Sequence, residues 1–265
     1  MLIDWMRSGQ SELAPEKQGV VVNISEFAVL ERELSARFKA RRGFCLATLN
    51  LDHVVKLRDD SSFHAAYLAH DFVTADGNPI VWLSKIAKSP VSLMAGADLI
   101  WPIVDLAASS GIRVALLGST AETLERSARQ MRERHPNLEI VACIAPPMEF
   151  DPTGELADTY IAELAKADAG LCFLALGAPK QELFAAHAAT RADRIGFVSI
   201  GAGLDFIAGQ QKRAPAIVRK FAAEWLWRLM SNPRRLGVRY ARCVAVMPRL
   251  IWFALKVRLE NHKDT

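Results

Sequence analysis

Short apolar runs alternate with longer amphipathic stretches along most of this chain, and this alternation constrains the fold more than any other feature. The apolar runs, which are typical of buried strands, cover residues 20–24, 44–50, 72–74, 114–118, 138–144, 171–176 and 196–200. Helices are expected over residues 26–40 (capped by Ser25), 52–70, 78–88, 96–110, 122–134, 158–167 and 182–191. Strands separated by helices build a mostly parallel sheet covered by helices, so the sequence predicts an α/β fold.

Three of the predicted strands end in glycine followed by polar residues. These ends are Gly118-Ser-Thr120, Gly177 to Glu182, and Gly201 to Asp205. Ligands of open α/β sheets bind beyond the carboxyl ends of the strands, so we expect these segments to line one crevice. At Gly118 the amides of the following helix start could hold a phosphate, but the rest of a G-x-G-x-x-G motif is missing. An ordinary α/β turn therefore stays open there.

The stretch from Asp71 to Gly77 joins a β-prone run to the pair Asp76-Gly77. An aspartate at the end of such a strand is either a turn former or a catalytic group. The local sequence is compatible with both.

The net charge of +4 conceals two regions of opposite sign. Residues 213–265 contain 12 Lys and Arg against three acidic residues, so residues 1–212 are net acidic. We therefore predict an α/β catalytic core over residues 1–212 and a helical, basic, amphipathic appendage over residues 213–265. In the appendage four basic residues recur every seven positions, on one face of a helix that Pro248 is expected to interrupt: Arg235, Arg242, Arg249 and Lys256.

Tryptophans and aliphatic residues lie between these charges, but no apolar run is long enough to span a membrane. A basic amphipathic segment with tryptophan is typical of a helix at a membrane surface. A solvated basic face on a docked helix is the alternative, and RNA binding is less favoured because no recognition motif accompanies the charge. An exposed apolar patch would also favour a homo-oligomer.

Several kinds of site are disfavoured by what the sequence lacks. The four cysteines are far apart with no C-x-x-C pair, which argues against a disulfide scaffold or zinc site and fits a reducing cytoplasm. G-x-S-x-G, H-E-x-x-H and P-loop motifs are absent, and the six histidines have no metal-ligand spacing. Because no D-x-D pair occurs either, a bound diphosphate would be neutralised by amides and arginines, and no metal is expected.

Short blocks of chemically distinctive residues follow one another in a fixed order. They are Thr48-x-Asn50, Ala75-Asp-Gly77, Gly177-x-Pro-Lys-Gln-Glu182, Gly201-x-Gly203-x-x-Phe206-x-Ala-Gly209, Arg213-Ala-Pro215, Glu224-Trp-x-Trp-Arg228, Pro233-Arg-Arg235 and Arg239. In these blocks the chain resembles the WecG/TagA/CpsF glycosyltransferase family, over roughly residues 20–240. The resemblance implies a Rossmann-like α/β fold of the GT-E type and an inverting, metal-independent reaction. It also implies a cytoplasmic protein, peripheral on the inner face of the bacterial membrane, that moves a sugar from a UDP-sugar to a polyprenyl-diphosphate-linked sugar.

The resemblance further assigns roles to individual residues. Asp76 is implied as the catalytic base that takes the proton from the acceptor hydroxyl. The sugar pocket would contain Thr48, Asn50, Gly77, Asn78 and Gln181. The nucleotide and its diphosphate would be bound by Gly118, Ser119, Gly177, Lys180, Gly201, Gly203, Asp205, Arg213, Arg228, Arg235 and Arg239.

One loop departs from the family pattern. Many members that transfer N-acetylmannosamine have a Gly-Tyr-Phe-like loop where this chain has Pro146 to Phe150. The loop is more similar to the exopolysaccharide branch of the xanthan or acetan kind, so glucose is the expected donor sugar and N-acetylmannosamine or its uronate the alternative. Outside the family, a nicotinamide-dependent oxidoreductase would need a complete dinucleotide fingerprint, which is absent. A non-catalytic membrane-docking protein would explain the basic appendage but not the polar strand ends.

Overall fold

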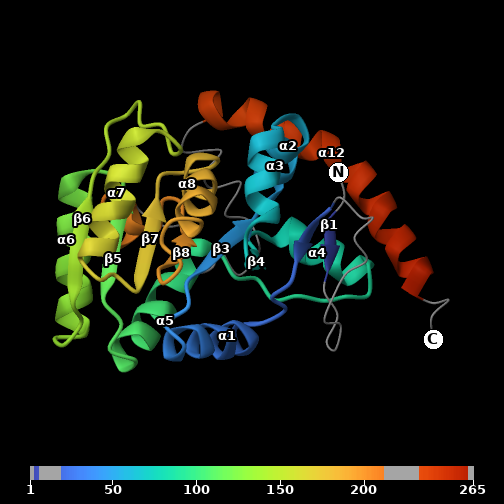
Figure 1. Cartoon of the computed structure of the whole chain (residues 1–265). Coiled ribbons are helices and arrows are strands. Elements are labelled where there is room, and N and C mark those ends of the chain that lie inside the picture. Colours follow the sequence, from blue (N-terminus) through green and yellow to red (C-terminus); the bar gives the residue numbers. More distant parts are fainter. Residues whose placement is uncertain (1–2, 6–18, 212–232, 262–265) are drawn as a thin grey trace.

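The protein is built on a six-stranded, entirely parallel sheet with strand order β4-β3-β8-β7-β5-β6 (Figure 1). The computed structural model describes residues 3–5, 19–211 and 233–261. The strands of the sheet are β3 (Phe44–Leu49), β4 (Phe72–Ala75), β5 (Val114–Gly118), β6 (Ile140–Ile144), β7 (Leu171–Ala175) and β8 (Gly196–Ser199). The α/β fold predicted from the alternation of apolar and amphipathic stretches is confirmed.

The predicted first strand does not join this sheet. Residues Val20–Val22 form β2, which pairs in parallel with β1 (Ile3–Trp5) in a separate two-stranded sheet. The segment after β2 is bonded to β4 of the main sheet: Ile24 N donates to Val73 O at 3.3 Å, and Val73 N donates to Asn23 Oδ1 at 2.8 Å. The small sheet therefore extends the β4 side of the fold.

Helices cover both faces of the sheet, which explains why its strands are apolar on both faces. All six residues of β3 are buried. Leu46 packs in one hydrophobic cluster with Leu30 and Leu34, whereas the Cys45 thiol donates a hydrogen bond to Ala185 O at 3.3 Å on the other face. The first face is covered by α1 (Phe27–Lys39), α5 (Gly96–Ser109), α6 (Ala121–Arg134) and the short α9 (Gly203–Ile207). The second face is covered by α7 (Glu155–Lys166) and α8 (Lys180–Ala189).

A third cluster encloses the β3–β4 edge with α2 (Leu51–Asp59), α3 (Ser61–Leu68), α4 (Asn78–Ile86) and α12 (Pro233–Asn261). The single helix predicted over residues 52–70 was wrong, because it is divided at Asp60. The Asp60 carboxylate accepts a hydrogen bond from Phe63 N at 2.9 Å and so caps a new helix. Ser25 likewise is not a cap, since α1 begins after Glu26 without a side-chain cap.

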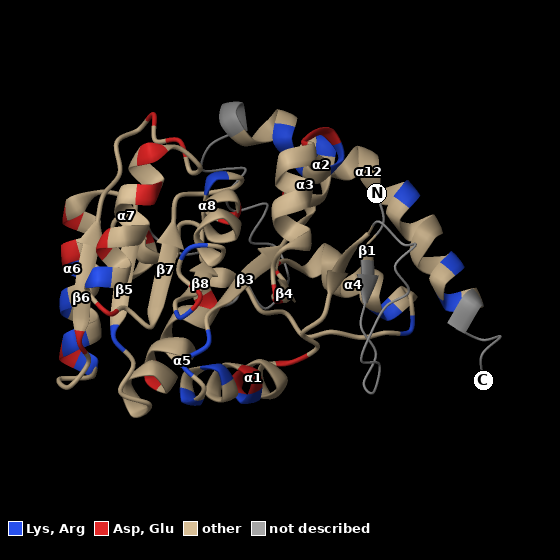
Figure 2. Cartoon of the chain, viewed as in Figure 1, with Lys and Arg blue, Asp and Glu red and all other residues tan. Residues whose placement is uncertain are grey.

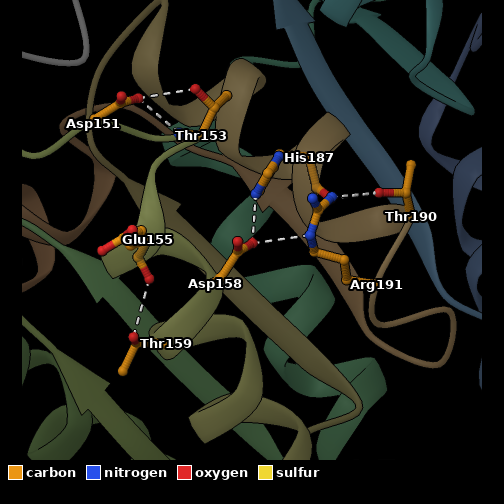
Figure 3. A network of polar contacts seen from close by, with 8 residues as sticks. All are labelled: Asp151, Thr153, Glu155, Asp158, Thr159, His187, Thr190 and Arg191. Atoms are coloured by element: carbon orange, nitrogen blue, oxygen red, sulfur yellow. Dashed lines mark hydrogen bonds and ion pairs between the residues drawn. The ribbon is translucent and has the colours of Figure 1, made fainter.

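Helices α7 and α8 are fastened to each other by a polar network (Figure 3). Asp158 of α7 lies 2.7 Å from His187 Nε2 and 2.9 Å from Arg191 Nε. Before α7, Asp151 accepts hydrogen bonds from both the amide and the hydroxyl of Thr153 at 2.9 Å. The contacts of Asp158 thus hold α8, whose first turn carries Gln181, against α7.

The C-terminal helix α12 is continuous over 29 residues and packs on α2 and α4 (Figure 1). The predicted interruption at Pro248 was wrong. Pro248 lies on the exposed side of the helix, where the carbonyl that loses its hydrogen bond can be solvated, so the helix continues. None of the helices in the described part of the chain has the length and apolar character needed to cross a membrane.

The two faces of α12 differ in composition. Cys243, Leu250, Ala254 and Val257 are buried against the body of the protein. The outer face, defined here as Val244, Ile251, Trp252, Leu255 and Leu259, exposes large apolar side chains. Basic residues recur along the helix (Figure 2). Among them, Arg242, Arg249 and Lys256 are exposed. The predicted boundary at residues 212 and 213 falls where the structure describes nothing further until residue 233, so the two-domain division stays a prediction.

Candidate functional site

The carboxyl ends of the parallel strands form one edge of the sheet, and most of the predicted site residues lie along it. The strand order places the loops after β8, β7 and β5 side by side, and the loops after β3 and β4 continue the same edge. Asn50, Asp76, Gly177, Gly201 and Asp205 are all partly exposed there. This edge is therefore the candidate site.

Asp76 directly follows β4, and its backbone amide donates to Leu49 O at 2.8 Å, which continues the pairing of β3 and β4. One carboxylate oxygen lies 3.5 Å from the hydroxyl of Thr48. Gly77 then turns the chain into α4 with φ at 107°, a conformation that favours glycine. Asp76-Gly77 is thus a turn, and the same turn holds a partly exposed carboxylate at the edge of the sheet.

The buried side chains of Tyr67 and His53 form a polar pair that contacts the backbone of Thr48. The Tyr67 hydroxyl donates to Thr48 O at 3.3 Å and lies 2.7 Å from His53 Nδ1. Burial lowers the pKa of His53 to about 3, so the imidazole is neutral at pH 7. Burial, together with the charges of Glu182 and Asp76, raises the pKa of Tyr67, so the phenol keeps its proton. No metal-ligand spacing was found for His53 in the sequence, and Tyr67 was not singled out, because the two residues come from different helices and meet only in three dimensions.

The residues around Thr48 begin two helices. The Asn50 side-chain oxygen accepts from His53 N at 3.0 Å and caps α2. Asn78 is the first residue of α4. The sugar-pocket residues Thr48, Asn50, Gly77 and Asn78 are therefore brought together by β3 and β4, whereas Gln181 comes from α8, which follows β7 and packs against α3, β8 and β3.

The P-K-Q-E block forms the first turn of α8, which starts two residues before the predicted position. Gln181 is buried, and its oxygen accepts from the amide of Gly201 at 3.0 Å. Lys180 instead donates to Met148 O at 3.0 Å, so the loop at residues 146–150 lies against the start of α8. Burial raises the pKa of Glu182 to about 7, opposed by hydrogen bonds from Gln181 and from its own backbone and by the charge of Lys56.

The loops after β5 and β8 are joined through Asp205. Its carboxylate accepts from Ser119 Oγ at 2.8 Å and from Gln211 Nε2 at 2.9 Å. Gly118 has φ at 115°, and a Cβ there would meet the carbonyl carbon of Ala175 at 2.4 Å. This position therefore requires glycine because two strand ends approach closely. Gly203 is buried, and an added Cβ would meet Ile100 Cδ1 at 2.5 Å, so it serves packing of α9 on α5.

Cationic side chains reach the β3 side of the edge from two helices. Arg239 Nε of α12 lies 2.9 Å from Asp52 Oδ1, and Lys56 Nζ lies 3.0 Å from the other oxygen of Asp52. Lys56 also donates to Ala178 O at 3.2 Å, beside Gly177. Sequence reasoning missed Lys56, although its spacing of four residues from Asp52 on a helix predicts an ion pair. The side chains of Arg213, Arg228 and Arg235 lie outside the described residues.

The arrangement offers a partly exposed carboxylate, Asp76, that can accept a proton from a hydroxyl group bound at the sheet edge. The cations Lys56 and Arg239, which both pair with Asp52, lie on the β3 side of the same edge and suit an anionic ligand. Within the described part of the chain no group of three or more His, Cys, Asp or Glu side chains is placed to hold a metal ion. The site residues and the absence of a cofactor stay predictions.

Two comparisons with known proteins bear on this site. A model of the "Glycosyl transferase WecG/TagA/CpsF family" matches residues 18–264. An N-acetylglucosaminyldiphosphoundecaprenol N-acetyl-beta-D-mannosaminyltransferase of Bacillus spizizenii is 27% identical over 195 residues, which are 73% of this chain and 74% of that protein. The family match therefore extends over both the sheet and the C-terminal helix.

Proposed function

The chain belongs to the WecG/TagA/CpsF family of glycosyltransferases, and from this premise we propose that it moves N-acetylmannosamine from a UDP-sugar to a polyprenyl-diphosphate-linked sugar. The observation that carries the proposal is the position of Asp76: a partly exposed carboxylate on the carboxyl edge of the sheet, beside Thr48. Glucose, which the loop at residues 146–150 led us to expect, has no support from the Bacillus relative. The name of that protein gives N-acetyl-beta-D-mannosamine as the sugar transferred, so the alternative donor takes first place.

In this proposal Asp76 removes the proton from the acceptor hydroxyl while the oxygen attacks the anomeric carbon of the donor. The bond from that carbon to the diphosphate oxygen breaks, and UDP leaves with the bonding electron pair. Inversion follows because the acceptor enters opposite the leaving group. The negative charge that develops on UDP needs fixed cations, and in this proposal Lys56 and Arg239 supply them.

We place the reaction at a membrane surface because the outer face of α12 exposes aliphatic and aromatic side chains next to basic ones (Figure 2). An amphipathic helix of this kind binds at the boundary of headgroups and acyl chains, and basic residues favour anionic lipid. Arg239 lies on the same helix and contacts Asp52 beside the site. A peripheral position would thus bring the site to a lipid-linked acceptor.

The decisive experiment incubates the full-length protein with UDP-N-acetylmannosamine, its uronate, UDP-N-acetylglucosamine and UDP-glucose, each with polyprenyl-diphosphate N-acetylglucosamine. We expect a β-linked disaccharide lipid from UDP-N-acetylmannosamine, formed equally well with EDTA. Product from UDP-glucose alone would move the donor assignment to glucose, and loss of activity in EDTA would refute metal independence. If no donor gave product, the proposed reaction would be wrong.

A further inference from the structure

The carboxyl group of Glu182 is completely buried in the first turn of α8, close to the candidate site. Its Oε1 accepts a hydrogen bond from Gln181 Nε2 at 2.8 Å, whereas Oε2 has no hydrogen-bond partner among the described residues. Enclosing a carboxyl group that is only half satisfied is costly, and an apolar side chain would fit a purely structural position better. The residue therefore needs an explanation beyond packing.

The Gln181 amide lies between two groups that favour the same orientation, the Gly201 amide and the Glu182 carboxyl group. The Gly201 amide is a donor, so the group 3.0 Å from it must be the oxygen of Gln181. The nitrogen of Gln181 then faces Glu182, and only an acceptor at that position stabilises this orientation. One hydrogen of Gln181 Nε2 is left without a partner in the described part of the chain.

The hydrogen bond from the Gly201 amide to Gln181 joins the loop after β7 to the loop after β8. Gln181 belongs to the β7–α8 turn, and Gly201 follows β8, which lies next to β3 in the sheet. Glu182 also interacts electrostatically with Lys56 and with Tyr67. Tyr67 in turn donates a hydrogen bond to Thr48 O and interacts electrostatically with Asp76. Glu182 thus interacts with residues next to the candidate site on both sides: Gln181 in the turn after β7, and Lys56 and Tyr67 near β3.

We propose that Glu182 is a positioning residue of the transfer reaction, which fixes the Gln181 amide so that its oxygen holds the loop after β8 and its remaining N–H is oriented for the substrate. The expected effect of Glu182 on transfer rests on the proposed function, whereas its effect on the orientation of Gln181 does not. The simpler alternative is that Glu182 only stabilises the start of α8, because an acidic residue near a helix N-terminus is favourable. A purely local role of that kind would not depend on Gln181.

The test compares Glu182→Gln, Glu182→Leu and the exchange Gln181→Glu with Glu182→Gln, using Glu163→Leu on the exposed face of α7 as the control. Glutamine at position 182 retains an acceptor oxygen, so we expect kcat within about 3-fold of wild type. Leucine leaves Gln181 Nε2 unpaired, and we expect kcat to fall about 10–100-fold with a smaller change in KM. In the exchange, the amide now at position 182 can donate to the carboxylate now at position 181, which still accepts from the Gly201 amide. We expect the loop to be restored there but transfer to stay low.

Hydrogen exchange of the Gly201 amide, followed by NMR, reports the link without any substrate. Protection should be lost in Glu182→Leu and kept in Glu182→Gln and in the exchange. Wild-type kcat in Glu182→Leu, or equal impairment of the glutamine and leucine variants, would refute the proposal. If Glu182→Leu did not fold, Glu182→Met would test the same link, because it also removes the acceptor for Gln181 Nε2 with a flexible side chain of similar length. Unchanged Gly201 protection there would also refute the proposal. A wild-type protein without transferase activity would defeat the proposed function, while the Gly201 measurement would still decide whether Glu182 orients Gln181.

Discussion

The side chains at the carboxyl edge of the sheet are held by hydrogen bonds to one another, whereas those on the outer face of α12 are apolar and exposed to solvent. At the sheet edge, polar groups hold one another in place, as Thr48 does with Asp76 and Ser119 with Asp205. On α12, Trp252 and Leu259 are each 64% exposed although the other face of the helix is buried. The edge is organised before any ligand arrives, whereas the outer face of α12 becomes satisfied only against another apolar surface.

We therefore expect substitutions at the sheet edge to affect the reaction, and substitutions on the outer face of α12 to affect membrane binding. A preorganised edge loses reactivity when one group is altered, because the remaining groups cannot compensate. An exposed apolar face loses binding gradually, since each side chain contributes roughly in proportion to the area that it buries. Three experiments on the full-length protein test this contrast.

The largest effect is expected for Asp76→Asn at the edge. Asparagine keeps the shape and the turn but cannot take a proton, so we expect kcat to fall about 100- to 10,000-fold while UDP-sugar binding is retained. Steady-state kinetics and calorimetric titration of the donor measure the two quantities. Asp193→Asn, in an exposed turn at the opposite end of β8, is the matched control and should behave as wild type. A kcat within about 3-fold of wild type for Asp76→Asn would show that Asp76 orients the acceptor and is not the base.

A smaller effect is expected on the outer face of α12. Replacing Ile251, Trp252 and Leu255 together by serine removes apolar area that would be buried in lipid, so binding to anionic phospholipid vesicles should weaken about 10–100-fold. Co-sedimentation with vesicles measures this affinity. The fold should persist, because the buried face is untouched.

The control for this experiment is Leu156→Ser, which alters an exposed leucine on α7 and should leave vesicle binding unchanged. Vesicle binding that survived the triple substitution would remove α12 as the membrane contact. Binding lost equally in the control would point to a general effect of surface hydrophobicity.

The smallest effect is expected where the two regions meet, at the ion pair between Asp52 and Arg239. Asp52 is only 12% exposed, so a double-mutant cycle with Asp52→Asn and Arg239→Gln should give a coupling of about 1 kcal/mol in urea unfolding. The exposed pair Glu122–Arg126 on α6 serves for comparison and should give about 0.3–0.5 kcal/mol. Additive costs at Asp52 and Arg239 would mean that α12 is held by its apolar contacts alone.

Much of the fold follows from local patterns, but the site depends on contacts that no local pattern contains. For example, β3, which follows Gly43, and β5, which ends at Gly118, were predicted from their apolar runs. Such runs are expected because the strands of a parallel sheet are buried on both faces. The pairing of Tyr67 with His53 was not predicted, because neither residue has a distinctive spacing. Likewise the motif that contains Gln181 and Glu182 was recognised, but not that Glu182 is buried, which follows from α8 beginning at Lys180.

By itself the sequence determined the alternation of strands and helices, the glycine and polar residues at the strand ends, and the basic character of the C-terminal segment. These features are local, since they depend on periodicity, turn chemistry and charge within a few residues. Only the tertiary structure decided that Asp76 lies beside Thr48, that Glu182 faces Gln181 behind the site, and that α12 continues through Pro248. The physical reason is that burial and hydrogen-bond partners are set by segments that are distant in sequence and become neighbours only when the sheet and its helices pack together.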